Sequence, residues 1–424
     1  MRPIDSRWAR DWGRRDRRGP SARSVLAVFA VLVIIAAVLA VIQLFVRSVP
    51  PVRYISTAPA SFRVPGPAPV LPFPSQGEAT VGLLGVGTMG SSGGDAPVPI
   101  ASLTKMMTAY LILRDHPLTE GEEGPAITVS ASDTATEEVD AAGGQSVVKV
   151  QAGEQLTEHQ ALEALLVGSA NNVGTLLANW DAGSQAAFVT RMNSEAASLG
   201  MTATHYADPT GLDAATVSSA SDQVSLAEKA MTNPVFAGIV DLAQINLPVA
   251  GTVFNYDYLV GHDGIIGIKT GSTAEAGGCF VFAAIRAVGP VPIVVIGAVV
   301  GQQGPSILQA ALNASLALIN AAGAAAHPVS LSLPDHGQVA HLTAPWASPV
   351  AVVAPGTWST IGWGGLTVDV GVSHRAPLGP VGHLIAGAQL GTVTLTLAGQ
   401  HHSFPATLQA TVPSASARWR LERF

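Results

Sequence analysis

The sequence predicts an α/β sandwich-like domain that is preceded by a transmembrane helix and followed by a small all-β domain. Three observations support this prediction. Val25–Val46 is a long run without charge, apolar residues recur with helical spacing between Ser102 and Val240, and three apolar runs separated by Gly and Pro follow between residues 265 and 300. Helices together with buried neighbouring strands are typical of a domain in which both kinds of element share one core.

Composition and charge exclude some classes of partner. The chain has 424 residues, of which 48% are hydrophobic, so it can bury more than one core. Residues 1–24 hold eight arginines against three aspartates, so the rest of the chain is more acidic than the net charge of −7 suggests. An acidic body argues against nucleic acid as a partner. The single cysteine, Cys279, cannot form an internal disulfide, and its apolar neighbours predict a small buried residue.

The run Val25–Val46 predicts a membrane anchor. It contains 22 residues with Gln43 as its one clearly polar side chain, which is enough to cross a bilayer as a helix. Arginines precede it, so residues 1–24 are expected to form a cytoplasmic tail and the rest of the chain to lie outside the membrane. A cleaved signal peptide is the alternative. An uncleaved anchor is favoured because signal peptides have shorter apolar regions, and the cleavage-like Ala58-Pro59-Ala60 lies far downstream.

Eight prolines between residues 47 and 75 predict an extended linker that holds a domain away from the membrane. The main globular domain is expected over residues 76–325. It begins with a predicted strand at Ala79–Val86 and a Gly/Ser-rich turn region at Met89–Pro97.

Helices and then strands are predicted along the rest of this domain. The first helix runs from Ser102 through Leu113, and a capping box of Thr157 and Gln160 opens a second helix that ends at Leu166. Further helices are predicted over residues 175–180, 184–198, 225–240 and 305–321, and buried strands over residues 265–269, 279–288 and 291–300.

Beyond Pro328 the helical pattern disappears, and a small β domain is predicted over residues 326–413. Residues 414–424 are short and basic and are expected to form a solvated tail. The predicted strands of the β domain cover residues 329–333, 350–353, 366–372 and 392–397.

Ser102 and Lys105 form the first of three motifs that carry chemistry. The chain has only four lysines, and Ser102-Leu-Thr-Lys105 and Lys269-Thr-Gly271 contain two of them. Residues three apart on a helix lie on one face, so the two side chains can reach each other. A lysine can remove the proton of a serine only when it is neutral, and apolar burial and a second cation favour that form. Lys269 is a candidate for the second cation, and a solvated helix position is the alternative reading of this motif taken alone.

The second and third motifs place further polar groups near a cleft. In Ser169-Ala-Asn171 the hydroxyl suits proton relay and the amide can bind a substrate peptide group, although both residues also serve as ordinary helix caps. In Lys269-Thr-Gly271 the lysine favours anions, Thr270 can bind a carboxylate and Gly271 lets a substrate backbone approach. A plain strand end with a turn glycine is the alternative. The order of the three motifs, with spacings of 67 and 100 residues, favours the functional reading.

The chain resembles a low-molecular-weight penicillin-binding protein of the D-alanyl-D-alanine carboxypeptidase family, whose catalytic domain has a β-lactamase/transpeptidase-like fold of helices and an antiparallel sheet. The resemblance covers residues 76–325 well. The Ala376–Gly379 and Leu390–Leu395 stretches faintly resemble the β-rich C-terminal domain of such enzymes. The extended matches are Pro99-Ile-Ala-Ser-Leu-Thr-Lys-Met-Met-Thr-Ala-Tyr110, Asp208-Pro-Thr-Gly-Leu-Asp213 and Asp263-Gly-Ile-Ile-Gly-Ile-Lys-Thr-Gly-Ser-Thr273.

The resemblance implies a hydrolase of the cell wall, a serine carboxypeptidase that acts on the terminal D-Ala-D-Ala of peptidoglycan stem peptides, contributes to cell shape and is acylated by β-lactams. By position, Ser102 is implied as the nucleophile, Lys105 as its base and Ser169 as the proton relay. The implied substrate-binding residues are Asn171, which would bind the amide, Lys269, which would supply positive potential, and Thr270, which would bind the terminal carboxylate. Gly271 and Ser272 follow on the same strand. The backbone N–H of Ser272 would join that of Ser102 in the oxyanion hole.

Two departures from the family pattern affect substrate binding. The family often has an arginine just after the strand that follows the Lys-Thr-Gly strand, whereas the corresponding stretch here is Gly301-Gln-Gln-Gly-Pro305. The second motif reads Ser-Ala-Asn-Asn where Ser-Gly-Asn-Asp is frequent. Efficient binding of the substrate carboxylate is therefore an open question at the sequence level.

Two alternative functions share these residues. A catalytically weak or silent membrane-tethered scaffold would explain the missing arginine, and a β-lactamase would need an added acid, for which Glu195 and Glu228 lie in helical patterns. The eleven histidines show no metal-ligand spacing, so neither a metal nor a cofactor is expected. Hydrolysis or transpeptidation, the preferred stem peptide and the oligomeric state stay open.

Overall fold

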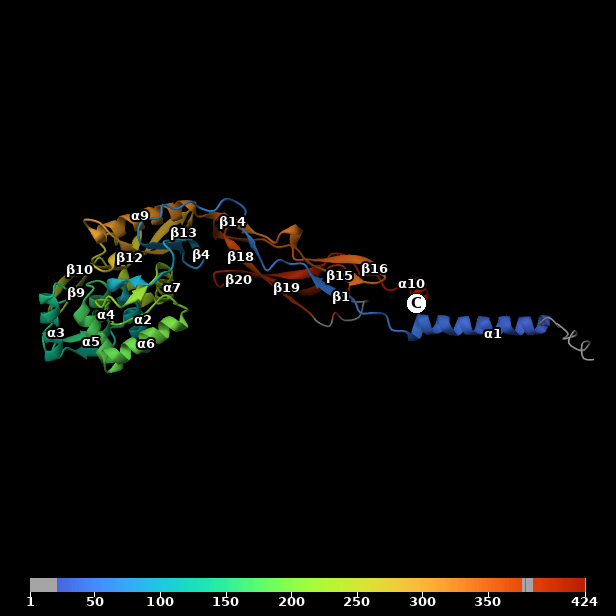
Figure 1. Ribbon diagram of the computed structural model, residues 1–424, viewed down its shortest axis with the longest axis horizontal. Helices are drawn as coiled ribbons and strands as arrows, with labels where there is room; N and C mark the ends of the chain where they lie inside the picture. Colours follow the sequence, from blue (N-terminus) through green and yellow to red (C-terminus); the bar gives the residue numbers. More distant parts are fainter. Residues whose placement is uncertain (1–20, 376–377, 379–383, 424) are drawn as a thin grey trace, which may run out of the picture.

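The computed structural model describes residues 21–375, 378 and 384–423, which form an elongated molecule (Figure 1). A unit of helices and sheet lies at one end, a second β unit lies in the middle, and the helix α1 (Ala22–Val41) lies at the other end. The arginine-rich tail predicted for residues 1–24 falls mostly outside the described residues, as do Ala376, Pro377 and Gly379 of the faint C-terminal match.

The helix α1 continues into a π-helical turn, η1 (Ile42–Val46), and the two together span 25 residues. None of the α1 residues is buried. Within the described chain, α9 (Ile307–Ala325) is also long and apolar enough to cross a bilayer, but its Leu312, Leu318 and Ile319 are fully buried. Length, composition and exposure therefore single out α1 with η1 as the candidate membrane span.

The unit of helices and sheet, in which the sequence analysis expects catalysis and which is called the catalytic unit below, is built on a five-stranded antiparallel sheet with the order β11-β12-β13-β3-β4. The three apolar runs predicted as strands are confirmed as β11, β12 and β13. The predicted turn region at residues 89–97 is wrong in its first part, since Met89 is buried and its small neighbours let β4 pair with β3 at the sheet edge. The strands are β3 (Glu78–Leu83), β4 (Gly87–Ser92), β11 (Ile265–Thr273), β12 (Gly277–Val288) and β13 (Val291–Gln302).

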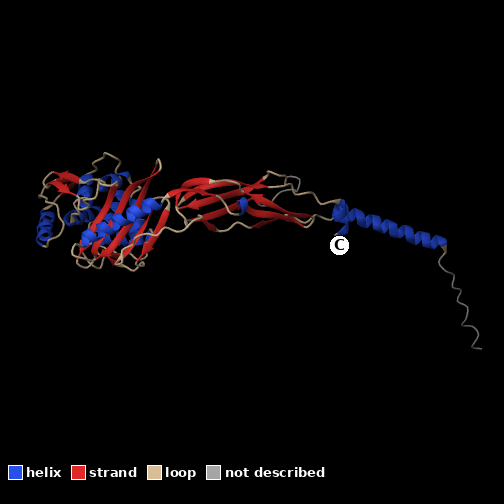
Figure 2. Cartoon of the chain, turned by 90° about the horizontal axis from the view of Figure 1, so that it is seen from above, coloured by secondary structure: helices blue, strands red, loops and turns tan. Residues whose placement is uncertain are grey.

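Alternate residues of the sheet face two different cores, because successive side chains of a strand point to opposite faces. On β12, Cys279 and Val281 join the core of the helical part, while Phe280 and Phe282 join a second core that contains α9 and continues into the β unit. Cys279 is buried, as predicted, and burial raises the pKa of its thiol to about 12. Figure 2 shows helices covering the sheet.

The helical part contains seven α-helices, and their ends follow local capping signals. The predicted capping box of Thr157 and Gln160 is confirmed at the start of α4. The single helix predicted over residues 225–240 is instead two, because Asn233 caps a new helix that begins at Pro234. The helices are α2 (Lys105–Asp115), α3 (Ala131–Ala142), α4 (Glu158–Leu166), α5 (Asn171–Ala182), α6 (Gln185–Ser198), α7 (Ala220–Ala230) and α8 (Pro234–Val240).

The helix α3 was not predicted from the sequence. It is polar, and its one large apolar residue, Val139, is 70% exposed, so the helix lacks the apolar stripe on which sequence patterns depend. A capping box of Ser130 and Asp133 marks its start. Short strand pairs complete this part: β5 (Val98–Pro99) with β8 (Val217–Ser218), β6 (Ala126–Thr128) with β7 (Gln155–Thr157), and β9 (Gln244–Leu247) with β10 (Gly251–Phe254).

The β unit contains a seven-stranded sheet with the order β1-β15-β16-β20-β19-β18-β2. Its strands are β1 (Arg53–Ser56), β2 (Ser61–Arg63), β15 (Gln338–Ala344), β16 (Ala347–Val353), β18 (Thr367–His374), β19 (Gln389–Leu397) and β20 (Gln400–Leu408), while β14 (His327–Leu331) pairs separately with β17 (Trp358–Gly362).

Part of the predicted linker belongs to this sheet. The strands β1 and β2 lie within residues 47–75 and form its two edges, where they pair with β15 and β18. The prolines flank these strands instead of interrupting them, and edge strands tolerate nearby proline. Residues 53–63 therefore do not act as a free spacer.

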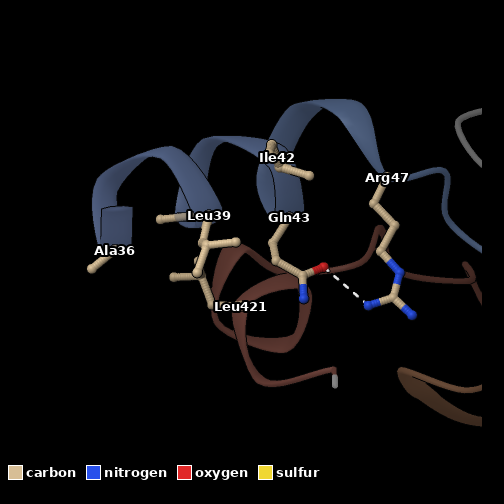
Figure 3. Close-up of a pocket in the computed structure, with 7 residues that line it drawn as sticks. Ala36, Leu39, Ile42, Gln43, Arg47 and Leu421 are labelled. Carbon is tan, nitrogen blue, oxygen red and sulfur yellow. Dashed lines mark hydrogen bonds between the residues drawn. The ribbon is translucent and has the colours of Figure 1, made fainter. Parts of the chain in front are cut away.

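The C-terminal segment contacts the end of the candidate membrane span, although none of the α10 residues is buried. Arg420 of α10 (Ala417–Glu422) donates to the backbone oxygen of Leu44 at 2.8 Å, and Arg423 donates to that of Gln43 at 3.3 Å. The last carbonyl groups of a helix lack intrahelical donors, and these guanidinium groups supply them. Figure 3 shows Leu421 beside Leu39 at this junction, in a pocket that Ile42 also lines.

Candidate active site

Ser102 lies in a 3₁₀ turn, η2 (Ala101–Thr104), and Lys105 is the first residue of α2. The Nζ atom of Lys105 donates to Ser102 Oγ at 2.7 Å. The Lys105 side chain is completely buried, whereas Ser102 is only half-buried. The first motif therefore brings a buried amine into direct contact with an accessible hydroxyl.

The surroundings of Lys105 favour its neutral form. Burial lowers the pKa of Lys105 well below its ordinary value, and the positive charge of Lys269 lowers this pKa further. The carboxylates of Asp208 and Asp140 act in the opposite direction. An amine that is neutral near pH 7 can accept the proton of a neighbouring hydroxyl.

A loop organised by Asp208 holds the amine from its other side. Lys105 Nζ donates to the backbone oxygen of Thr210 at 3.1 Å. The Asp208 carboxylate accepts hydrogen bonds from the backbone N–H groups of Thr210, Gly211 and Leu212 at 3.1, 2.9 and 3.0 Å. Thr108 on α2 donates to the backbone oxygen of Pro209 at 2.6 Å. These contacts fix the carbonyl group that positions Lys105.

The second motif lies in the connection between α4 and α5. Ser169 is buried and has a φ of 52°, a left-handed conformation that costs free energy in a residue other than glycine. Asn171 begins α5 and donates from Nδ2 to Gln145 Oε1 at 2.8 Å. The Oδ1 atom of Asn171 is buried without a partner among the described residues. This oxygen is free to accept an N–H group from a ligand.

Gln145 and Asp140 are residues of the site that the sequence analysis missed. Gln145 lies in the loop after α3, and hydrogen bonds from Asn171 N to Ser146 O at 2.8 Å and from Val148 N to the Asn172 side chain at 3.2 Å hold this loop against the second motif. Asp140 is at the end of α3, and burial raises the pKa of its carboxyl group. Since α3 itself has no apolar stripe, no sequence pattern pointed to either residue.

The third motif lies on β11, which runs against η2. Lys269 and Thr270 are buried, while Ser272 is exposed. A Cβ atom on Gly271 would lie 2.9 Å from the backbone nitrogen of Ser102, so only glycine allows this close approach. The strand edge and the serine backbone therefore form one surface.

Lys269 is near its point of titration at neutral pH. Burial lowers the pKa of Lys269 to about 7, although the nearby carboxylate of Asp257 acts to raise it. Asp257 is 2% exposed, and its Oδ1 atom accepts from the backbone of Leu259 at 3.1 Å. Burial raises the pKa of Asp257 to about 6. Asp257 thus tunes the charge of Lys269.

The structure describes all of residues 76–325. Within this range, no arginine lies at the end of the sheet that bears Gly278 and Ser272. Here β13 ends at Gln302, whose side chain donates to the backbone oxygen of Gln76 at 2.7 Å. The three arginines of this range bind elsewhere: Arg114 to Glu195, Arg191 to Asp181 at 2.6 Å, and Arg286 to the backbone oxygen of Asp263 at 2.6 Å.

Comparisons with known proteins identify the family of the chain. A family model described as D-alanyl-D-alanine carboxypeptidase matches residues 89–300. The carboxypeptidase DacB2 of Mycobacterium tuberculosis is 33% identical over 215 residues, which cover 49% of this chain and 69% of that protein. A D-alanyl-D-alanine endopeptidase of Pseudomonas aeruginosa is 32% identical over 212 residues, which cover 48% of this chain and 65% of the relative.

Solved structures share the fold. The Streptomyces K15 DD-transpeptidase aligns with a TM-score of 0.53 at 24% identity and covers 60% of this chain and 99% of its own. Penicillin binding protein 5 from Haemophilus influenzae aligns with a TM-score of 0.58 at 19% identity and covers 81% of this chain and 99% of its own. The second alignment extends the likeness of fold beyond the catalytic unit.

Replacement of Gly211 by alanine is expected to destabilise the catalytic unit by more than about 2 kcal/mol, because its φ is 83° and a Cβ atom would lie 1.8 Å from the backbone oxygen of Ala101. Gly183→Ala is the matched control, since Gly183 has a φ of 74° but no neighbour within 4 Å, and should cost about 1 kcal/mol. Thermal unfolding of the full chain followed by near-UV circular dichroism measures both. Equal losses would contradict the close contact at Ala101.

Gln145→Met is expected to slow acylation by penicillin about tenfold, because it keeps the length of the side chain but removes the acceptor that orients Asn171. Gln145→Glu keeps an acceptor and should retain most of the rate. Stopped-flow measurement of the second-order acylation rate distinguishes the two variants. A similar rate for Gln145→Met and the wild type would show that Asn171 is oriented by other contacts.

Asp257→Asn is expected to move the alkaline limb of the pH profile to lower pH. The Asp257 carboxylate stabilises the ammonium form of Lys269, so its removal lowers the pKa of Lys269 below about 7 and the positive charge is lost earlier as pH rises. The measurement is kcat/KM for a D-Ala-D-Ala peptide between pH 5 and 9. An unchanged or alkaline-shifted limb would rule out this coupling.

Proposed function

The chain belongs to the D-alanyl-D-alanine carboxypeptidase family of serine peptidases, and on that premise we propose that it removes the terminal D-alanine from peptidoglycan stem peptides through an acyl-enzyme on Ser102. The observation that carries this proposal is the 2.7 Å hydrogen bond between Ser102 Oγ and the buried Nζ atom of Lys105. A serine needs a neighbouring base to become a nucleophile, and burial lowers the pKa of Lys105 well below its ordinary value, which favours the neutral form that can act as one.

In the acylation step, neutral Lys105 accepts the Ser102 proton while Oγ attacks the carbonyl carbon between the two D-alanine residues. The negative charge that develops on the carbonyl oxygen is stabilised by the backbone N–H groups of Ser102 and Ser272. The close approach of Gly271 to Ser102 N supports this oxyanion hole, because it brings β11 next to the serine backbone.

Departure of D-alanine requires a proton on its nitrogen. Ser169 is proposed to relay the proton from Lys105 to this amine, and the left-handed backbone at Ser169 supports a constrained orientation of its hydroxyl. Asn171 would hold the substrate through Oδ1, which is buried and lacks a partner among the described residues. Water then attacks the ester carbonyl carbon, which releases the shortened peptide and restores the Ser102 hydroxyl.

The substrate carboxylate would bind without an arginine. Protonated Lys269 supplies positive potential, and the Thr270 and Ser272 hydroxyl groups on the same strand edge can donate hydrogen bonds to the carboxylate. Because Lys269 titrates at about pH 7, this attraction weakens as pH rises above neutrality. We therefore expect weaker binding of the carboxylate than an arginine–carboxylate pair would give.

A β-lactamase and a silent scaffold are the competing functions. Of the two acids considered for a β-lactamase, Glu195 accepts a hydrogen bond from Arg114 and Glu228 lies within α7, and neither makes a hydrogen bond to Ser102, Lys105 or Ser169 among the described residues. A silent scaffold conflicts with the intact contact between Ser102 and Lys105. The names of the relatives include endopeptidases and a transpeptidase, so the choice of water as the acyl acceptor is part of the proposal.

The location of the enzyme follows from its anchor. We propose that α1 and η1 cross the cell membrane with the N-terminus in the cytoplasm, and that the catalytic unit lies outside, where the peptidoglycan substrate is. The elongated arrangement supports this placement, because the β unit separates the catalytic unit from α1 (Figure 1).

Incubation with penicillin is expected to add one covalent adduct to the wild type and none to Ser102→Ala, as measured by intact-mass spectrometry. Ser225→Ala, an exposed serine on α7, is the control and should still be acylated. The wild type should also release D-alanine from diacetyl-Lys-D-Ala-D-Ala. An adduct on Ser102→Ala would refute the assignment of the nucleophile. An adduct on the wild type without D-alanine release would support the silent scaffold. Rapid steady hydrolysis of nitrocefin by the wild type would indicate a β-lactamase.

A further inference from the structure

Three aromatic side chains are exposed on the segment that ends β10 and follows it, and one of them, Tyr258, donates from its hydroxyl group to the Gln309 side chain of α9. Phe254 is 67% exposed, Tyr256 is 47% exposed and Tyr258 is 52% exposed. Outside α1 and η1, no other Phe, Tyr or Trp of the described residues is classed as exposed. We call Phe254, Tyr256 and Tyr258 the aromatic face. Exposed apolar groups that gather on one segment mark a surface that binds another molecule.

The intervening residues attach this segment to the active site. Val253 lies beside Gly168, next to Ser169 of the second motif, since a Cβ atom on Gly168 would lie 3.1 Å from Val253 Cγ1. Asn255 donates from Nδ2 to the backbone oxygen of Leu242 at 3.0 Å, and buried Asp257 tunes the charge of Lys269. Because these inward residues alternate with the aromatic ones, the rings are exposed on the outer side of a segment that borders the site.

The segment that bears the aromatic face is neutral and polar, although exposed Asp241 and Asp263 lie just outside it. Between residues 242 and 261 the one charged residue is Asp257, which is buried. Gln244, Asn246 and Thr252 are exposed on the adjoining β9–β10 hairpin, where Thr252 donates to the Asn246 side chain at 2.8 Å. This hairpin lies at the end of the molecule away from α1 (Figure 1). Neutrality argues against nucleic acid, and the distance from α1 argues against a lipid surface.

We propose that the aromatic face binds the glycan strand that carries the stem peptide, a neutral chain of N-acetylated pyranose rings. The C–H face of a pyranose packs against an aromatic ring, and its hydroxyl and acetamido groups suit the nearby amide and hydroxyl side chains. This inference rests on the proposed carboxypeptidase function. It makes the aromatic face a determinant of specificity for glycan-linked over free stem peptides.

The test compares two substrates of the full chain in detergent. Phe254→Ala combined with Tyr256→Ala should lower kcat/KM about tenfold for D-alanine release from stem peptides attached to glycan. The same double variant should leave release from diacetyl-Lys-D-Ala-D-Ala and acylation by penicillin unchanged. Ile285→Ala with Val291→Ala is the matched control, because these side chains are 46% and 44% exposed on β12 and β13. Phe254→Trp with Tyr256→Phe should keep the wild-type preference.

Equal losses on both substrates, or no loss on the glycan-linked one, would overturn the proposal. A second measurement does not depend on catalysis. It compares how much Ser102→Ala, with and without the double substitution, co-sediments with insoluble glycan from which the peptides have been removed. Binding should fall about tenfold with the double substitution, and equal binding would overturn the proposal. Absence of D-alanine release by the wild type from either substrate would instead refute the proposed carboxypeptidase function.

Discussion

Burial of the Lys105 amine is the constraint on which the active site depends. A charged ammonium group loses several kcal/mol of hydration when it leaves water, so the buried site favours the neutral amine, which is also the form that can act as a base. Such a group needs polar partners in place, and Ser102 Oγ and the backbone oxygen of Thr210 provide them. The Asp208 loop, α2 and β11 enclose the Lys105 side chain, which is completely buried, and keep its amine next to these two acceptors.

The same site contains strained backbone conformations and buried polar atoms without hydrogen-bond partners among the described residues. Ala101 and Ser169 both have left-handed backbones, and the Oδ1 atom of Asn171 and the Oδ2 atom of Asp257 are buried without partners among the described residues. Strain and unpaired polar atoms cost free energy, and their concentration around Ser102 is typical of a site organised for binding a transition state. The core formed by the sheet, α9 and the β unit supplies the packing that holds these features in place.

Much of the fold was predictable because its signals are local. The capping box at Thr157 and the apolar runs of β11, β12 and β13 depend only on neighbouring residues. The unpredicted elements depend on partners far along the chain. The edge strands β1 and β2 form only because β15 and β18 pair with them, and α10 is placed by contacts with η1 more than 370 residues away in sequence. The helix α3 has a local capping box at Ser130, but it is polar and lacks the apolar stripe by which a helix is predicted.

The sequence by itself determined that Ser102 and Lys105 meet, because residues three apart at the start of a helix share one face. It also determined the order of the three motifs and the apolar length of the candidate membrane span. Only the tertiary structure decided that Thr210, Gln145 and Asp257 take part, since they reach the motifs through loops and long-range contacts. The lowered pKa values of Lys105 and Lys269 likewise belong to the fold, because burial and neighbouring charge exist only after the chain has packed around them.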